Sequence, residues 1–263
     1  MIADRFQIER LAGEGGMGQV FRAVDRTTGA PVALKIMRDG MPPAEVNRFA
    51  READVLDTAR HPGIVRYIAR GEVAEGRAFF AMEWIDGETL RDRLSRRGMT
   101  IAETVALGRR LSAALGALHR AGVVHRDLKP GNVLLRDGDP GDAVLLDLGI
   151  ARRGDLERLT LTGVNVGTPG FLAPEQARGA ADIDPRADVF ALGCVLYECL
   201  CGQPAFAGEH PLAILGRVLL EEPRPVGSRC RPISGTSTAR RWRVGSRAAS
   251  PTTASAGRWC RRC

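Results

Sequence analysis

The sequence predicts an α+β fold in which a small antiparallel β-sheet with one helix precedes a larger, mainly helical region. The first part of the chain, up to Ile85, contains five short β-like runs and one amphipathic segment, separated by glycine-bearing turns. After Asp86 and Gly87, apolar residues recur at helical spacing. The 263 residues, 44% hydrophobic, suffice for one large domain or two modest lobes with a core.

The elements of the first region follow from residue type and spacing. Its β-like runs are residues 6–11, 19–24, 31–37, 65–69 and 78–84. Between the third and fourth runs, residues 44–58 are expected to form a helix. Its apolar face is predicted from Val46, Phe49, Ala53 and Leu56.

The second region opens with a capping-box pattern at Thr100 and Glu103, which predicts a helix ending at Gly122. The apolar face of this helix is expected to carry Val105, Leu111, Leu115 and Leu118. A further helix is predicted over residues 185–201, because Gly202 follows its last apolar residue.

Residues 228–263 differ from the rest of the chain in composition. They contain nine Arg, no Lys, Asp or Glu, and none of the Leu, Phe or Met that would bury a helix face, so we expect disorder. The net charge is +7, and removing this +9 leaves −2 for residues 1–227. A nucleic-acid-binding surface is therefore not expected on the main domain. The segment is either a genuine basic tail or the product of a reading frame lost near residue 228.

The sequence shows no membrane span and no secretory signal. The longest apolar-rich stretch, residues 189–200, is short for a transmembrane helix and contains Glu198. The N-terminus is charged from Asp4 onward and lacks an apolar core. We therefore expect a cytoplasmic protein.

A glycine-rich segment, with Gly13, Gly15 and Gly18 in a G-x-G-x-x-G pattern, lies between the first two predicted strands. Glycines allow the backbone to fold over a phosphate without Cβ clashes. The dinucleotide-binding version of this pattern requires a helix directly afterwards. A strand is predicted there instead, so that version is not favoured.

Lys35 and Glu52 are expected to form an ion pair. The chain has 36 Arg but only two Lys, and Lys35 stands in an otherwise apolar strand. Glu52 lies three residues after Phe49 and four before Leu56, so it shares the buried face of its helix. A carboxylate facing a core is costly unless it is paired.

Polar residues converge after the helix that ends at Gly122. Residues 133–135 and 144–146 are predicted to form a hairpin, which brings Asn132 beside Asp147. Asp127 precedes Asn132 by five residues, and Lys129 lies between them. An amide and two carboxylates beside a Lys suit Mg²⁺ and a polyphosphate.

Together these motifs resemble those of the bacterial eukaryotic-type (Hanks-type) protein serine/threonine kinases. The matching segments, in the family's order, are GEGGMGQV (13–20), VALK (32–35), Glu52, HRDLKPGN (125–132), DLG (147–149) and GTPGFLAPE (167–175). The resemblance implies a bilobal kinase-like fold, truncated or frameshifted in its C-terminal lobe. Its parts would be an N-lobe over 1–85, a C-lobe over 86–227 and the tail at 228–263.

The resemblance also implies residue roles. ATP would be bound by Gly13, Gly15, Gly18, Val20, Lys35 and the backbone of Glu83 and Ile85. Asp127 would be the catalytic base and Lys129 would lie near the transferred phosphate. Lys35, held by Glu52, would contact the α- and β-phosphates. Asn132 and Asp147 would hold Mg²⁺, with Mn²⁺ as an alternative metal.

The implied reaction is transfer of the ATP γ-phosphate to Ser or Thr hydroxyls of proteins. Thr160 and Thr162 are expected autophosphorylation sites, because a phosphate there could order the loop by facing Arg126. A transient homodimer would serve autophosphorylation in trans. The alternative is a non-catalytic nucleotide- or partner-binding remnant, since the resemblance stops near residue 223.

Overall fold

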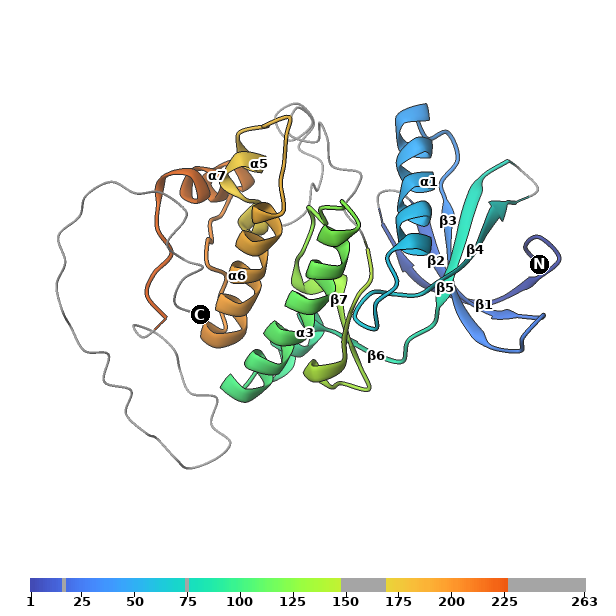
Figure 1. Cartoon of the computed structure of the whole chain (residues 1–263), viewed down its shortest axis with the longest axis horizontal. Coiled ribbons are helices and arrows are strands. Elements are labelled where there is room, and N and C mark those ends of the chain that lie inside the picture. The colour runs from blue at the N-terminus through green and yellow to red at the C-terminus, as the bar shows by residue number, and fades with distance from the viewer. Residues whose placement is uncertain (16–17, 74–75, 148–168, 227–263) are drawn as a thin grey trace. The chain divides into compact units, whose positions relative to one another are not determined.

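Five antiparallel strands form the sheet that the first part of the sequence predicts (Figure 1). The computed structural model describes the chain over residues 1–15, 18–73, 76–147 and 169–226. The strands are β1 (Phe6–Glu14), β2 (Gly18–Asp25), β3 (Pro31–Met37), β4 (Tyr67–Glu72) and β5 (Ala78–Glu83), in the order β1-β2-β3-β5-β4. All described residues fall within one compact unit, and the expected tail at 228–263 lies outside the described residues. The expected division of this unit at residue 85 stays a prediction.

Strand β4 begins two residues later than predicted, because Val65 has another partner. The Val65 N–H donates to the carbonyl of Leu145 at 2.9 Å, and the Leu145 N–H donates to Gly63 at the same distance. The loop before β4 is thereby bonded to strand β8 (Ala143–Leu145) of the second region.

Helix α1 (Pro43–Thr58) packs against β4 and β5. Its residues Phe49, Ala53 and Leu56 are buried as expected, and the Phe49 ring lies 4.8 Å from that of Phe80. Val46 was expected on the same face but is exposed, so that prediction is wrong. Val46 stands in the first helical turn, one turn before the aromatic contact begins.

The second region is mainly helical. Its elements are β6 (Gly87–Thr89), α2 (Leu90–Arg96), α3 (Ile101–Arg120), β7 (Val133–Arg136), β8, α5 (Pro174–Ala177), α6 (Arg186–Cys201) and α7 (Pro211–Leu220). Three 3-10 turns accompany them at Pro130–Asn132, Pro140–Asp142 and Pro169–Phe171. Strands β6, β7 and β8 form a second antiparallel sheet, and α3 packs against α6. Four short elements, each of ten residues or fewer, were not predicted from the sequence: β6, α2, α5 and α7.

Helix α3 confirms the capping box. The Glu103 N–H donates to the Thr100 hydroxyl at 3.2 Å, and the Thr100 N–H donates to the Glu103 carboxylate at 2.8 Å. Leu111, Leu115 and Leu118 are buried, but Val105 is exposed, contrary to expectation. The buried stripe is continued by Leu107 instead, because Leu107 lies one i, i+4 step before Leu111.

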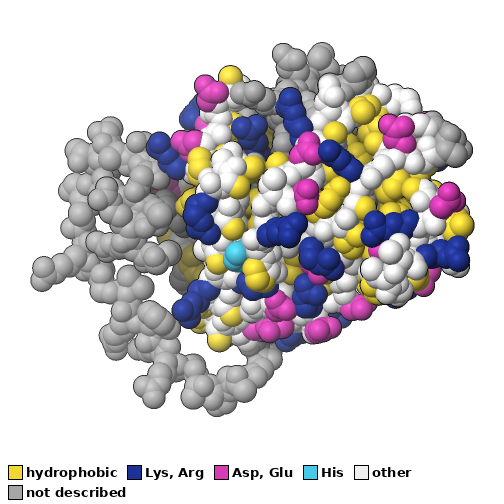
Figure 2. All heavy atoms as spheres, turned by 45° about the vertical axis from the view of Figure 1, so that its right-hand side comes forward, with side chains coloured by type: hydrophobic (Ala, Val, Ile, Leu, Met, Phe, Trp, Pro, Cys, Tyr) yellow, Lys and Arg dark blue, Asp and Glu magenta, His cyan; other side chains and the backbone are white. Residues whose placement is uncertain are grey.

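Two surface properties of the described residues bear on function. No helix among them is long and apolar enough to cross a membrane. On the face shown in Figure 2, Lys and Arg side chains lie interspersed with Asp and Glu rather than gathered into one basic patch.

Asp25 gives a pH-dependent stability prediction. The Arg5 guanidinium donates two hydrogen bonds to this buried carboxylate, at 2.9 and 2.7 Å, and holds its pKa at about 2, below the ordinary 3.8. A lowered pKa stabilises the fold above about pH 4, and this contribution is lost as the pH falls from 4 toward 2. We expect Asp25→Asn to lower the free energy of unfolding at pH 7 by about 1–2 kcal/mol. Measured by urea unfolding, the difference in unfolding free energy between the wild type and Asp25→Asn should shrink below pH 4. A difference that does not depend on pH would contradict the assignment.

Candidate active site

Lys35, Glu52 and Asp147 form a cluster that joins β3, α1 and the segment after β8. The Lys35 ammonium lies 3.1 Å from both carboxylate oxygens of Glu52 and 3.0 Å from Oδ1 of Asp147. The pairing of Lys35 with Glu52 confirms the expectation from the helix face. The contact with Asp147 was not predicted, because nothing in the sequence relates residues 112 positions apart.

Electrostatics keep Lys35 charged. Burial by itself lowers the pKa of Lys35, but the charges of Asp147 and Glu52 outweigh it and raise the pKa above its ordinary value. The charge of Lys35 in turn lowers the pKa of Asp147. The Lys35 and Glu52 side chains are 10% and 5% exposed, whereas that of Asp147 is 48% exposed. Asp147 is therefore the member of the cluster that solvent or a ligand can reach.

The predicted hairpin is present and places Asn132 as expected. Strand β7 pairs with β8, Val133 opposite Leu145, and the N–H of Leu146 donates to the carbonyl of Asn132 at 3.0 Å. Asn132 thus lies beside the residue that precedes Asp147.

Asp127, Lys129 and Asn132 form a second cluster. Oδ2 of Asp127 accepts hydrogen bonds from the Lys129 ammonium at 2.7 Å and from the Asn132 amide at 3.0 Å. The same amide nitrogen also donates to the Asp127 carbonyl at 2.9 Å. These bonds fix the orientation of the Asp127 carboxylate while leaving its side chain 14% exposed.

Asp188, at the start of α6, holds the backbone before Asp127 and was not predicted as a site residue from the sequence. This fully buried carboxylate accepts hydrogen bonds from the N–H groups of His125 and Arg126, both at 2.8 Å. His119 contributes a third contact, 2.7 Å from its Nε2 to Oδ2 of Asp188. Arg126 has φ +66°, an uncommon left-handed conformation that these bonds stabilise. Its carbonyl accepts from the Gln176 side chain at 2.9 Å. The sequence signal that could have identified Asp188 is an Asp in the first turn of a largely apolar helix.

His125 lies inside the fold, beside the backbone of Asp127. It is fully buried, and burial lowers the pKa of its imidazole, which favours the neutral form. Its Nδ1 lies 3.3 Å from the Asp127 N–H and accepts that hydrogen bond.

Asp188→Asn tests the support of this loop. An amide can accept only one of the two backbone hydrogen bonds and places an N–H group against the other, leaving a buried donor unsatisfied. We expect kcat to fall about 10²-fold through misplacement of Asp127, and the free energy of unfolding to fall by about 1–3 kcal/mol. Asp39→Asn is the matched control, because Asp39 is 73% exposed in a surface ion pair. Equal activity of the two variants would contradict the role of Asp188.

The glycine-rich segment is the turn between β1 and β2. The Gly15 N–H donates to the Gly18 carbonyl at 2.9 Å, and residues 16–17 lie outside the described chain. A Cβ at Gly18 would lie 2.2 Å from the Ile36 carbonyl oxygen, so only glycine fits there. Cβ atoms at Gly13 and Gly15 would meet nothing within 4 Å, which leaves open space beside them. Val20 lies opposite Lys35 on β2.

At the end of β5, Glu83 and Ile85 are the residues expected at an adenine base. The N–H of Glu83 already donates to the carbonyl of Arg66 at 2.9 Å, so this group is not available to a base. Ile85 is buried.

The expected autophosphorylation sites, Thr160 and Thr162, lie outside the described residues.

The oxygen donors fit a magnesium ion held partly by phosphates. The amide nitrogen of Asn132 is taken up by Asp127, so its Oδ1 has no partner among the described residues. Oδ2 of Asp147 likewise has none, since Lys35 binds Oδ1. Within the same described residues, no group of three or more His, Cys, Asp or Glu could hold a metal alone. Mg²⁺ commonly takes one or two protein oxygens and completes its shell with phosphates and water.

This fold and these two clusters are typical of the protein kinase class. The protein kinase domain family matches residues 6–223, and the chain belongs to that family. The fold predicted from the sequence is thereby confirmed.

Among curated relatives, the chain is 41% identical over 219 residues to the DNA damage-responsive serine/threonine-protein kinase RqkA of Deinococcus radiodurans, covering 82% of the chain and 32% of RqkA. It is 38% identical to the serine/threonine-protein kinase PknA of Mycobacterium tuberculosis, covering 86% and 53%. The chain thus spans about a third to a half of these relatives. The crystal structure of Rad53 1–466 in complex with AMP-PNP matches with a TM-score of 0.66 at 26% identity, covering 82% of this chain and 53% of that one.

Proposed function

We propose that the chain is an ATP-dependent protein serine/threonine kinase. The observation that carries this proposal is the convergence of the two clusters at the β7–β8 hairpin, where Asn132 adjoins the segment of Asp147. The named serine/threonine kinases at 38–41% identity support it. Every residue of the implied catalytic set is present, which disfavours a non-catalytic remnant.

In the proposed reaction, the hydroxyl oxygen of a Ser or Thr attacks the γ-phosphorus of ATP, and the bond to the ADP oxygen breaks. Asp127 orients the hydroxyl and accepts its proton, because its carboxylate is held by Lys129 and Asn132. Lys129 stabilises negative charge on the transferred group.

Lys35 is proposed to bind the α- and β-phosphates. Its contacts with Glu52 and Asp147 hold the ammonium in place and keep it charged. Asn132 and Asp147 would hold Mg²⁺, with Mn²⁺ as the alternative, and a bound metal would neutralise phosphate charge. The turn between β1 and β2 would cover the phosphates with its backbone.

We further propose that the chain phosphorylates itself in trans at Thr160 or Thr162, within a transient homodimer. A phosphate on either residue would face the cation of Arg126 and order the loop. Phosphopeptide mapping of the active chain and its Thr→Ala variants tests this assignment, and phosphate found only at other positions would contradict it.

The test of the proposed activity uses an external substrate. Incubation with Mg²⁺, radiolabelled ATP and dephosphorylated casein should yield phosphoserine and phosphothreonine after acid hydrolysis. Chelation of Mg²⁺ by EDTA and the variant Asp127→Asn should each abolish the transfer. Phosphotyrosine alone, or label that persists in the Asp127→Asn variant, would contradict the proposal.

A further inference from the structure

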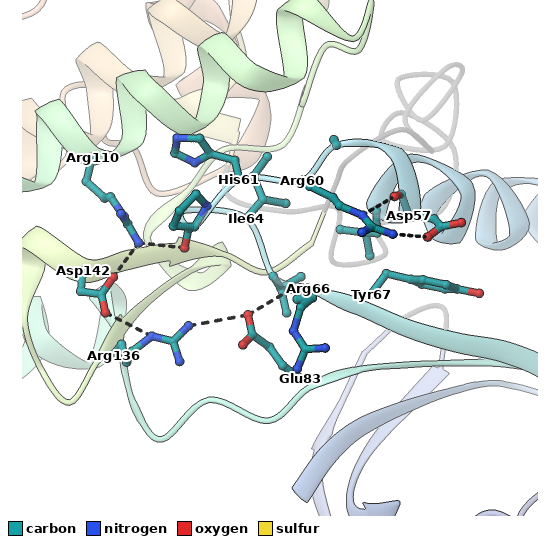
Figure 3. Close-up of a pocket in the computed structure, with 14 residues that line it drawn as sticks. Asp57, Arg60, His61, Ile64, Arg66, Tyr67, Glu83, Arg110, Arg136 and Asp142 are labelled. Atoms are coloured by element: carbon teal, nitrogen blue, oxygen red, sulfur yellow. Dashed lines mark hydrogen bonds and ion pairs between the residues drawn. The ribbon is translucent and has the colours of Figure 1, made fainter. Parts of the chain in front are cut away.

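A pocket of about 610 Å³ lies where the loop after α1 meets the second region (Figure 3). Its walls are residues 56–57, 59–62 and 64–67, Glu83, Arg110 of α3, Arg136 of β7 and Asp142. The volume is within the range of ligand sites. It shares only Glu83 with the predicted ATP site. At Glu83 that prediction involves the backbone, whereas the carboxylate bonds the N–H of Arg66 at 3.1 Å in the pocket wall.

The deeper carboxylates of this pocket are already neutralised. Asp142 pairs with Arg110 at 2.5 Å and with Arg136 at 3.2 Å, and Glu83 lies 3.6 Å from Arg136 (Figure 3). These acids therefore offer little charge to a cationic ligand. Their ion pairs hold the side chains of Arg110 and Arg136 in place.

The residues that line the pocket carry more positive than negative side chains. Four Arg but only three acids line it, and no acidic side chain of the described residues pairs with the exposed guanidinium of Arg66. Arg60 makes two long contacts with Asp57, 3.8 Å to its carboxylate and 3.5 Å to its carbonyl oxygen, and the Arg60 side chain is 86% exposed. The lining also includes the buried apolar residues Leu56, Ile64 and Val65, which we call the floor.

We propose that this pocket is a docking site for an acidic segment of a protein substrate, in which an apolar residue is flanked by carboxylates. The apolar residue contacts the floor, and a carboxylate pairs with Arg66 or Arg60 at the rim. The rim is open to solvent, since the Asp57 side chain is 58% exposed and that of Arg60 is 86% exposed. Calling the peptide a substrate rests on the proposed kinase function, but its binding does not.

Binding is tested with a fluorescein-labelled peptide that carries one Leu between two Glu, using the full chain with Asp127→Asn so that no transfer occurs. In low salt, fluorescence anisotropy should show saturable binding. Arg66→Glu should weaken it about tenfold, because one attraction becomes a repulsion. Arg51→Glu is the matched control, since Arg51 is exposed on α1 outside the pocket, and its effect should stay within about twofold.

Several results would overturn the docking site. Equal weakening by Arg66→Glu and Arg51→Glu would show non-specific attraction. Displacement of the peptide by a non-hydrolysable ATP analogue would place it in the ATP site. Competition by phosphate or succinate at the peptide's own concentration would assign the pocket to small anions.

A kinetic arm tests the link to substrates, with the chain that retains Asp127. A Ser-containing peptide extended by the acidic segment should have a lower KM than the same peptide without it, at unchanged kcat. Arg66→Glu should remove this advantage and leave the unextended peptide unaffected. A KM advantage that survives Arg66→Glu would contradict docking at this pocket. Failure of both peptides to be phosphorylated, with anisotropy binding intact, would contradict the kinase function instead.

Discussion

Replacing Asp127 with Asn is expected to lower kcat by about 10²–10⁴-fold, the range of a general base. The amide has the shape of the carboxylate, and its oxygen can still accept from Lys129 and Asn132, so the loop keeps its geometry. What is lost is the negative oxygen that takes the proton of the attacking hydroxyl.

Steady-state kinetics and thermal unfolding, measured together, check this prediction. The melting temperature should change little while kcat falls. Asp137→Asn is the matched control: Asp137 is exposed, has φ +50°, and lies in the same hairpin region. Asn tolerates this conformation well. An Asp127→Asn variant as active as Asp137→Asn would refute the role of base.

Lys35→Met is expected to cost both activity and stability. Loss of a preorganised cation at the phosphates should reduce kcat by about 10²–10³-fold. The variant also removes one partner of the buried ion pair with Glu52, whose side chain is 4% exposed. Breaking a buried ion pair in this way costs about 3–5 kcal/mol of unfolding free energy, which urea unfolding would report.

The double variant Lys35→Met/Glu52→Leu separates the two effects. With the buried carboxylate removed, most of the lost unfolding free energy should return, because apolar residues often replace a buried ion pair without loss. Activity should stay as low as in Lys35→Met. Recovery of activity with stability would mean that Lys35 acts only through folding.

The sequence predicted those parts of the site that depend on local patterns. Glu52 could be placed because helical spacing puts it between Phe49 and Leu56, and a buried acid requires a cation. Asn132 could be placed because a hairpin brings its two ends together. Both predictions rest on one element or on two adjacent elements.

Contacts between distant elements could not be predicted in this way. Asp188 supports Arg126 across 62 residues, and Lys35 reaches Asp147 across 112. Val46 and Val105 matched an apolar pattern but are exposed, because periodicity does not reveal where the packing partner ends. The pocket at Arg66 also escaped notice, since five separate segments build its walls.

The most direct measurement is the intact mass of the purified chain after incubation with Mg²⁺ and ATP, beside the Asp127→Asn variant. If the two clusters form a phosphotransfer site, the chain gains the mass of one or more phosphates and the variant gains none. An unchanged mass in folded protein, or the same gain in both proteins, would contradict the assignment of Asp127 and its cluster to phosphoryl transfer.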